Sequence, residues 1–118
     1  MTFQFDHAAQ VVDDIAQAVA WYLETIPGAR ALYQDESWAL LDAAGVKLAF
    51  VRPDQHPSHL AWRVPTAELE RLARQHGKQI ATHRDKTRSF YLEGPGGQCV
   101  EIISTEGTAY EKLTPIEP

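Results

Sequence analysis

The stretch SFYLEGPGGQCVEIIS, residues 89–104, is typical of two β-strands joined by a tight, glycine-rich turn. The strand after the turn is mostly apolar, yet Glu101 stands in its middle. A carboxylate buried in an apolar strand is costly unless hydrogen bonds, a cation or a metal ion compensate its charge. This stretch therefore predicts a hairpin and a special environment for Glu101.

Upstream of the hairpin, the sequence predicts a strand, a helix and a further strand. Thr66 is a candidate N-cap for the helix, which is expected to end at Gly77. The strands expected in this half of the chain are residues 59–64, 79–83, 88–93 and 98–104. Their order with the helix is β-α-β-β-β.

The first half of the chain shows the same order. A helix is expected from Asp13 or Asp14 to Pro27-Gly28, with an apolar stripe of Ile15, Val19, Trp21, Tyr22 and Ile26. The strands expected around it are residues 3–12, 30–34, 37–42 and 46–52. A single shift of 52 residues aligns His7 with His59, Ser37-Trp38 with Ser89-Phe90, and Gly45 with Gly97. The two halves are therefore predicted to be structurally equivalent.

We predict one α+β domain over residues 1–118, with two pseudo-symmetric β-α-β-β-β modules that form an incomplete, cupped β-barrel with the helices outside. Module one covers residues 3–52, a linker 53–58 and module two 59–104. The polar tail, residues 105–118, is expected to pack as a flap or to fray.

The repeat predicts where Glu101 lies. If the modules face one another around a pseudo-twofold axis, their first strands bring His7 and His59 together, and the last strand brings Glu101 to the same place. The equivalent of Glu101 in module one is Ala49. Two imidazoles and one carboxylate form a plausible ligand set for a divalent metal. The alternative is a structural carboxylate paired with Arg63.

Composition restricts the function classes. The chain has 118 residues and a net charge of −5, which argues against a nucleic-acid surface. A single cysteine, Cys99, excludes an internal disulfide and a Cys-based zinc site. We see no apolar run of the roughly 20 residues that span a bilayer and no signal-peptide pattern. The expectation is a cytoplasmic protein with no nucleic-acid or membrane partner.

Three stretches, FDHAAQVVDDIAQAVAWY, SHLAWRVPTAELERLA and SFYLEGPGGQCVEII, resemble the vicinal-oxygen-chelate superfamily. This group contains glyoxalase I, type I extradiol dioxygenases and fosfomycin-resistance enzymes. The resemblance covers about residues 3–104, with Gly94 standing where the superfamily motif usually has Asp. It implies a cupped sheet in which His7, His59 and Glu101 bind a divalent metal.

The resemblance also implies chemistry. Three protein ligands leave coordination positions open, which suits Fe(II) or Mn(II), with Ni(II) or Zn(II) as further possibilities. Tyr91 and His83 resemble, in position, a substrate-binding Tyr and an active-site His of extradiol dioxygenases, and are the implied catalytic residues. Glyoxalase I-like members have a fourth ligand where this chain has Ala49.

Three functions follow from the resemblance. The first is a metal-dependent enzyme acting on a small oxygen-chelating substrate, with extradiol-dioxygenase-like chemistry slightly favoured. The second is a thiol transferase of the fosfomycin-resistance type. The third is a metal-free, ligand-sequestering protein of the bleomycin-resistance type. A homodimer is implied in each case.

Overall fold

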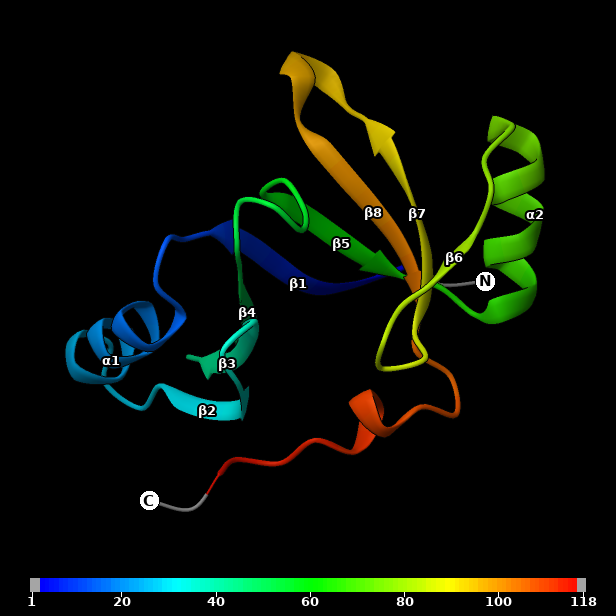
Figure 1. Ribbon diagram of the computed structural model, residues 1–118. Helices are drawn as coiled ribbons and strands as arrows, with labels where there is room; N and C mark the ends of the chain where they lie inside the picture. Colours follow the sequence, from blue (N-terminus) through cyan, green and yellow to red (C-terminus); the bar gives the residue numbers. More distant parts are fainter. Residues whose placement is uncertain (1–2, 117–118) are drawn as a thin grey trace. The chain divides into compact units, whose positions relative to one another are not determined.

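The computed structural model describes residues 3–116 of the chain (Figure 1). These residues contain eight strands and two α-helices, in the order β1-α1-β2-β3-β4-β5-α2-β6-β7-β8. The predicted α+β class and its two successive β-α-β-β-β series are therefore confirmed.

The chain divides into two compact units. The N-terminal unit contains His7–Ser58 together with residues 113–116, and the C-terminal unit contains residues 3–6 together with His59–Lys112. The boundary falls inside β1 (Gln4–Val11), between Asp6 and His7. Each unit thus takes one short segment from the opposite end of the chain.

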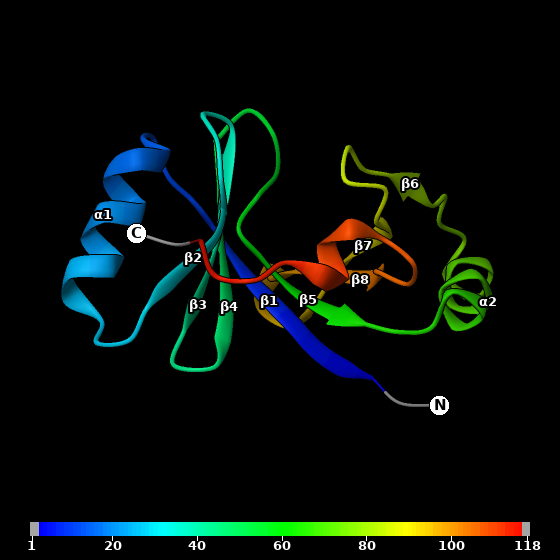
Figure 2. The ribbon, with the colours of Figure 1, turned by 90° about the horizontal axis from the view of Figure 1, so that it is seen from below.

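In the N-terminal unit the strands have the hydrogen-bonded order β2-β3-β4-β1, and β4 runs parallel to β1. Helix α1 (Ile15–Thr25) lies against one face of these strands, as Figure 2 shows. The strands are β2 (Arg30–Gln34), β3 (Trp38–Ala43) and β4 (Val46–Val51). The core of this unit consists of Ile15, Val19, Ala39, Leu41 and Phe50.

The predicted apolar stripe of α1 is wrong at one residue. Trp21 is 55% exposed, whereas Ile15 and Val19 are buried as expected. Residues three and four apart share a helix face, and Trp21 lies two residues after Val19, which turns it away from the sheet.

In the C-terminal unit the strand order is β5-β8-β7-β6, with β5 parallel to β8. Helix α2 (Thr66–His76) packs on β7 and β8 through Leu69, Ala73, Phe90 and Ile102. The strands are β5 (His59–Arg63), β6 (Ala81–Thr82), β7 (Arg88–Glu93) and β8 (Cys99–Ser104). Strand β8 therefore lies between β5 and β7, which brings its side chains to the centre of this sheet.

The start of α2 differs from the prediction. Thr66 is the first helical residue, and the N-cap position is occupied by Pro65, which makes no side-chain capping bond. The backbone N–H of Thr66 instead donates to the carboxylate of Glu106, which follows β8. A distant carboxylate thus replaces the local cap.

The tail packs against the C-terminal unit in part. It forms a short 3₁₀ turn, η2 (Ala109–Lys112), in which Tyr110 is buried. The Tyr110 hydroxyl donates to the carboxylate of Asp6 on β1. Of the two outcomes expected for the tail, packing is therefore the one observed for this segment.

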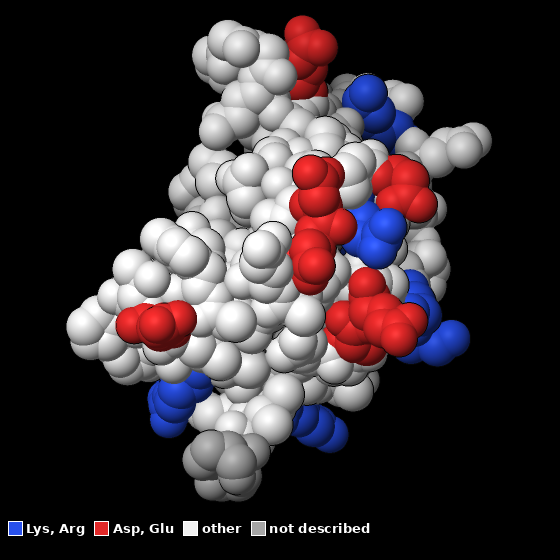
Figure 3. All heavy atoms as spheres, turned by 60° about the vertical axis from the view of Figure 1, so that its left-hand side comes forward, with Lys and Arg blue, Asp and Glu red and all other residues white. Residues whose placement is uncertain are grey.

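The surface is mixed in charge. On the face drawn in Figure 3, acidic side chains lie beside basic ones, and neither sign covers the face. In residues 3–116, neither helix is long and apolar enough to cross a bilayer.

Candidate functional site

Glu101 is buried in the C-terminal unit, with only 3% of its surface exposed. It lies on the central strand β8, opposite Ala61 of β5 on one side and Tyr91 of β7 on the other. The flanking strands hold it in the middle of a sheet, where water cannot solvate its charge. Its compensation must come from neighbouring side chains or from a bound ion.

Two histidines contact the carboxylate, one at each oxygen. His59 Nε2 lies 3.1 Å from Oε1, and His83 Nε2 lies 3.4 Å from Oε2. His59 begins β5 and is itself buried, whereas His83 follows β6 and keeps a fraction of its side chain exposed. Polar groups converging from three strand regions thus surround one buried charge.

The turn between β6 and β7 orients His83. Its backbone N–H donates to the carbonyl of Thr87, and its carbonyl accepts from the N–H of Lys86. The Asp85 carboxylate accepts hydrogen bonds from both the N–H and the hydroxyl of Thr87. The hydrogen bond to Glu101 raises the pKa of His83 above its usual value, against the opposing effect of burial.

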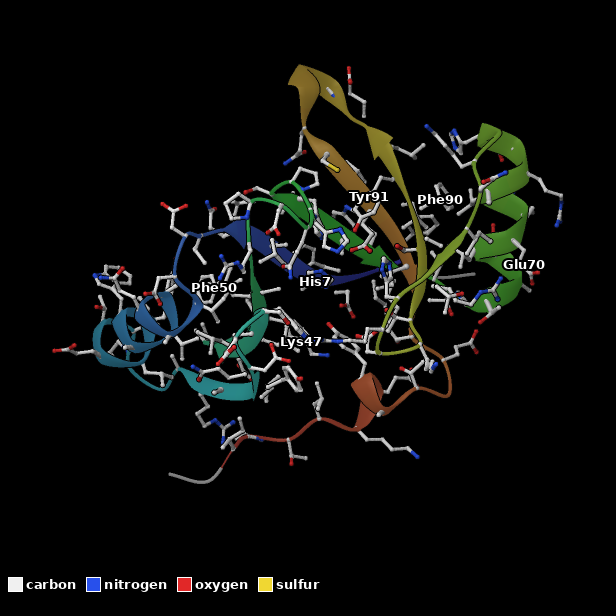
Figure 4. The ribbon with its side chains drawn as sticks, viewed as in Figure 1. His7, Lys47, Phe50, Glu70, Phe90 and Tyr91 are labelled. Carbon is white, nitrogen blue, oxygen red and sulfur yellow. The ribbon has the colours of Figure 1, made fainter. Side chains whose placement is uncertain are left out.

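Tyr91 lies directly beside this group. Its ring meets that of His59 edge-on, with centroids 5.3 Å apart. Burial, followed by the charge of Glu101 and a hydrogen bond with it, raises the pKa of the Tyr91 phenol far above its usual value. Figure 4 shows Phe90 pointing toward α2 and Tyr91 pointing to the opposite side of β7. Tyr91 is therefore a neutral hydrogen-bond donor at neutral pH.

Cys99 is opposite His59 in the register of β5 and β8. Burial and then the charge of Glu101 raise the pKa of its thiol. The thiol is therefore protonated at neutral pH and is a poor nucleophile.

Arg63, the alternative partner considered for Glu101, contacts different groups. Its guanidinium lies 3.4 Å from Asp6 Oδ1 and donates to Gln4 Oε1 at 2.5 Å. The carboxylate of Glu101 is instead compensated by histidines.

His7 is buried, with 8% of its surface exposed, and follows Asp6 directly in β1. Asp6 is fixed in the C-terminal unit by Tyr110 and Arg63. The residue that precedes His7 in the chain is therefore held in place by two side chains.

Ser89 was not predicted to be a site residue, although its Oγ lies 2.6 Å from His83 Nε2. It is fully buried. The available signal was its position two residues before Tyr91, on the same face of an alternating strand.

Comparisons with known proteins identify the fold. No family model matches the chain, and no curated protein is significantly similar to it. Among solved structures, a protein described as NAD-dependent benzaldehyde dehydrogenase from Legionella pneumophila has a TM-score of 0.66 at 15% identity, over 82% of this chain and 96% of its own.

Two further structures carry the superfamily or enzyme name. A glyoxalase/bleomycin resistance protein/dioxygenase superfamily member from Vibrio splendidus 12B01 has a TM-score of 0.61 at 14% identity, over 87% of this chain and 98% of its own. Homoprotocatechuate 2,3-dioxygenase from Brevibacterium fuscum has a TM-score of 0.61 at 19% identity, over 97% of this chain but 33% of its own. The chain therefore has the glyoxalase/bleomycin resistance/dioxygenase fold, as the sequence resemblance predicted.

Proposed function

We propose that this chain is a divalent-metal-dependent enzyme acting on a small substrate with two neighbouring oxygen atoms. His7, His59 and Glu101 would bind the metal, with Fe(II) or Mn(II) as the first candidates. Tyr91 and His83 would be the catalytic residues.

The observation that carries this proposal is the environment of Glu101. A buried carboxylate in contact with a buried imidazole, 3.1 Å from Oε1 to Nε2, presents two ligand atoms of the kind that divalent transition metals bind. His7 offers a further buried imidazole. The donor set of two imidazoles and one carboxylate fits the proposed metal without any cysteine ligand.

A divalent metal, when bound, supplies Lewis-acid activation of substrate oxygens. The protein's own side chains would hold the substrate and move its protons. The raised pKa of Tyr91 keeps its hydroxyl protonated, which suits it to donate a hydrogen bond to an anionic substrate oxygen. His83, which like Tyr91 lies beside Glu101, is the candidate proton acceptor.

Extradiol-dioxygenase-like chemistry is the favoured reaction because Tyr91 and His83 both lie beside Glu101. Their positions are those that the sequence resemblance assigns to substrate-contacting residues. We continue to predict a small-molecule substrate, a homodimer and a cytoplasmic location.

A metal-free binding protein is the second candidate, and one observation favours it. Among the side chains of residues 3–116, no buried nitrogen or oxygen atom lacks a hydrogen-bond partner. The histidines around Glu101 can therefore compensate its charge without an ion. In that case Glu101 is a structural carboxylate and the protein sequesters a ligand.

Metal analysis of anaerobically purified protein separates the two candidates. We expect near-stoichiometric iron or manganese in the wild type and loss of the metal in both His59→Ala and Glu101→Gln, because each variant removes one ligand. His76→Ala on α2 and Glu93→Gln on β7 change exposed residues of the same types and serve as matched controls that keep the metal.

If the wild type contains no metal and takes up none when Fe(II), Mn(II), Ni(II) or Zn(II) is supplied, the enzyme proposal is wrong. If metal is present, oxygen consumption with catechol is the next measurement, since it tests the favoured reaction directly.

A further inference from the structure

Ser89 is a polar side chain with 0% of its surface exposed, placed between the two proposed catalytic residues. It alternates with Phe90 along β7 and so shares with Tyr91 the strand face opposite α2. Its Oγ lies 2.6 Å from Nε2 of His83. A hydroxyl group at this position can therefore hold the His83 ring through a hydrogen bond.

The hydrogen bond between His83 and Ser89 has a preferred direction. His83 Nε2 faces the hydroxyl oxygen of Ser89 and also Oε2 of Glu101, at 3.4 Å. An ionised carboxylate accepts hydrogen bonds and cannot donate them. Nε2 of a neutral His83 therefore carries the hydrogen, and the Ser89 oxygen accepts it.

We infer that Ser89 is a positioning residue, whose buried hydroxyl accepts a hydrogen bond from Nε2 of His83 and holds that imidazole in place. This hydrogen bond favours the Nε2–H tautomer of His83. Since it assigns a role within the same site, this inference rests on the proposed function.

Long-range ¹H–¹⁵N correlation spectra of the imidazole rings test the inference. They are recorded on the full-length, metal-free protein at a pH above the titration range of histidine, with the His83 signals assigned by a His83→Gln variant. We expect the Nε2–H tautomer in the wild type. In Ser89→Ala, loss of one hydrogen bond lowers the ratio of the Nε2–H to the Nδ1–H tautomer about tenfold, and Ser89→Thr, which keeps the hydroxyl, restores the ratio.

Ser104→Ala is the matched control. Ser104 is also buried in this unit, and its Oγ hydrogen-bonds to Thr66 Oγ1 at 2.8 Å. The Ser104→Ala substitution removes a buried hydroxyl that does not contact His83, so we expect the His83 tautomer to be unchanged. An unchanged tautomer in Ser89→Ala overturns the inference, as does a change that occurs in Glu101→Gln alone, because Glu101 would then determine the tautomer by itself.

Titration of the same variants with Mn(II) distinguishes a failure of the Ser89 inference from a failure of the proposed metal-dependent function. We expect Ser89→Ala to bind Mn(II) within about twofold of the wild type, since Ser89 touches a substrate-facing histidine and no proposed ligand imidazole. A wild type that binds no metal contradicts the proposed function, whereas the spectra of the metal-free protein still decide the role of Ser89.

Discussion

Single carboxylates in this chain are stabilised in two different ways. Glu101 is buried and has imidazoles at both oxygens. Asp35 lies in the turn between β2 and β3, is half-buried and accepts hydrogen bonds from neutral donors. These donors are the Tyr33 hydroxyl, the N–H and hydroxyl of Ser37, and the N–H of Trp38.

The Asp35 carboxylate makes the folding stability of the protein depend on pH in the acid range. Burial alone would raise the pKa of Asp35, but the hydrogen bonds from Tyr33, Ser37 and Trp38 together bring it well below the ordinary value of 3.8. Because the folded pKa is lower than the unfolded one, the stabilisation is present above pH 3.8 and is lost as the pH falls toward the folded value.

We therefore expect Asp35→Asn to lower the free energy of unfolding by about 1 kcal/mol at neutral pH, at the low end for charged hydrogen bonds because the site is half-exposed. The difference from the wild type should shrink below pH 3.8. Urea denaturation at several pH values measures both effects. Glu36→Gln, next to it and exposed, is the control, and a deficit that stays constant down to strongly acidic pH would contradict the assignment.

At this scale the sequence predicted some features and missed others. The need of Glu101 for compensation follows from one acidic residue in an apolar run, and the structure confirms that polar side chains surround it. The partner of Arg63 and the role of Ser89 depend on side chains that meet only after the strands pair. Neither leaves a local pattern in the sequence.

The two helices begin in different ways. In α1, the side chain of Asp14 accepts from the N–H of Gln17 at 2.9 Å, which is a local N-cap. In α2, the N-terminal N–H of Thr66 is satisfied by Glu106 from beyond β8. Local capping is visible in a sequence, whereas a cap supplied 40 residues away is not. This explains why the predicted Thr66 cap is wrong and the start of α1 after Asp14 is correct.

The cap of α1 predicts a measurable loss. We expect Asp14→Ala to destabilise the protein by about 1 kcal/mol, since the N–H of Gln17 loses its partner. Asp13→Ala removes the same charge one residue earlier, without the capping bond, and should change stability by less than half as much. Equal effects of the two substitutions in urea denaturation would mean that charge, and not the cap, explains the loss.

At the scale of the whole molecule, segments near both ends of the chain form hydrogen bonds with distant residues, although their polar composition does not indicate this. Tyr110 donates to Asp6, whose side chain is fully buried and also contacts Arg63 at 3.4 Å. Near the other end of the tail, the N–H of Ile116 donates to the carbonyl of Ala31 on β2 at 2.7 Å. These contacts join residues that are about 100 and 85 positions apart, which no local pattern could predict.

We expect Tyr110→Phe to lower the free energy of unfolding by about 1–3 kcal/mol, because the buried carboxylate of Asp6 loses a hydrogen-bond donor. Tyr22→Phe is the control, because Tyr22 packs its ring against Phe50 and the ring is retained. Thermal denaturation of both variants is the measurement. A Tyr110→Phe variant as stable as the wild type would show that Asp6 is sufficiently compensated without the Tyr110 hydroxyl.

The division of the chain has a consequence for attempts to separate its halves. The sequence repeat indicates two equivalent halves, yet residues 3–6 belong to the C-terminal unit and residues 113–116 to the N-terminal unit. A gene cut at the linker would therefore deprive each product of a piece that its counterpart carries.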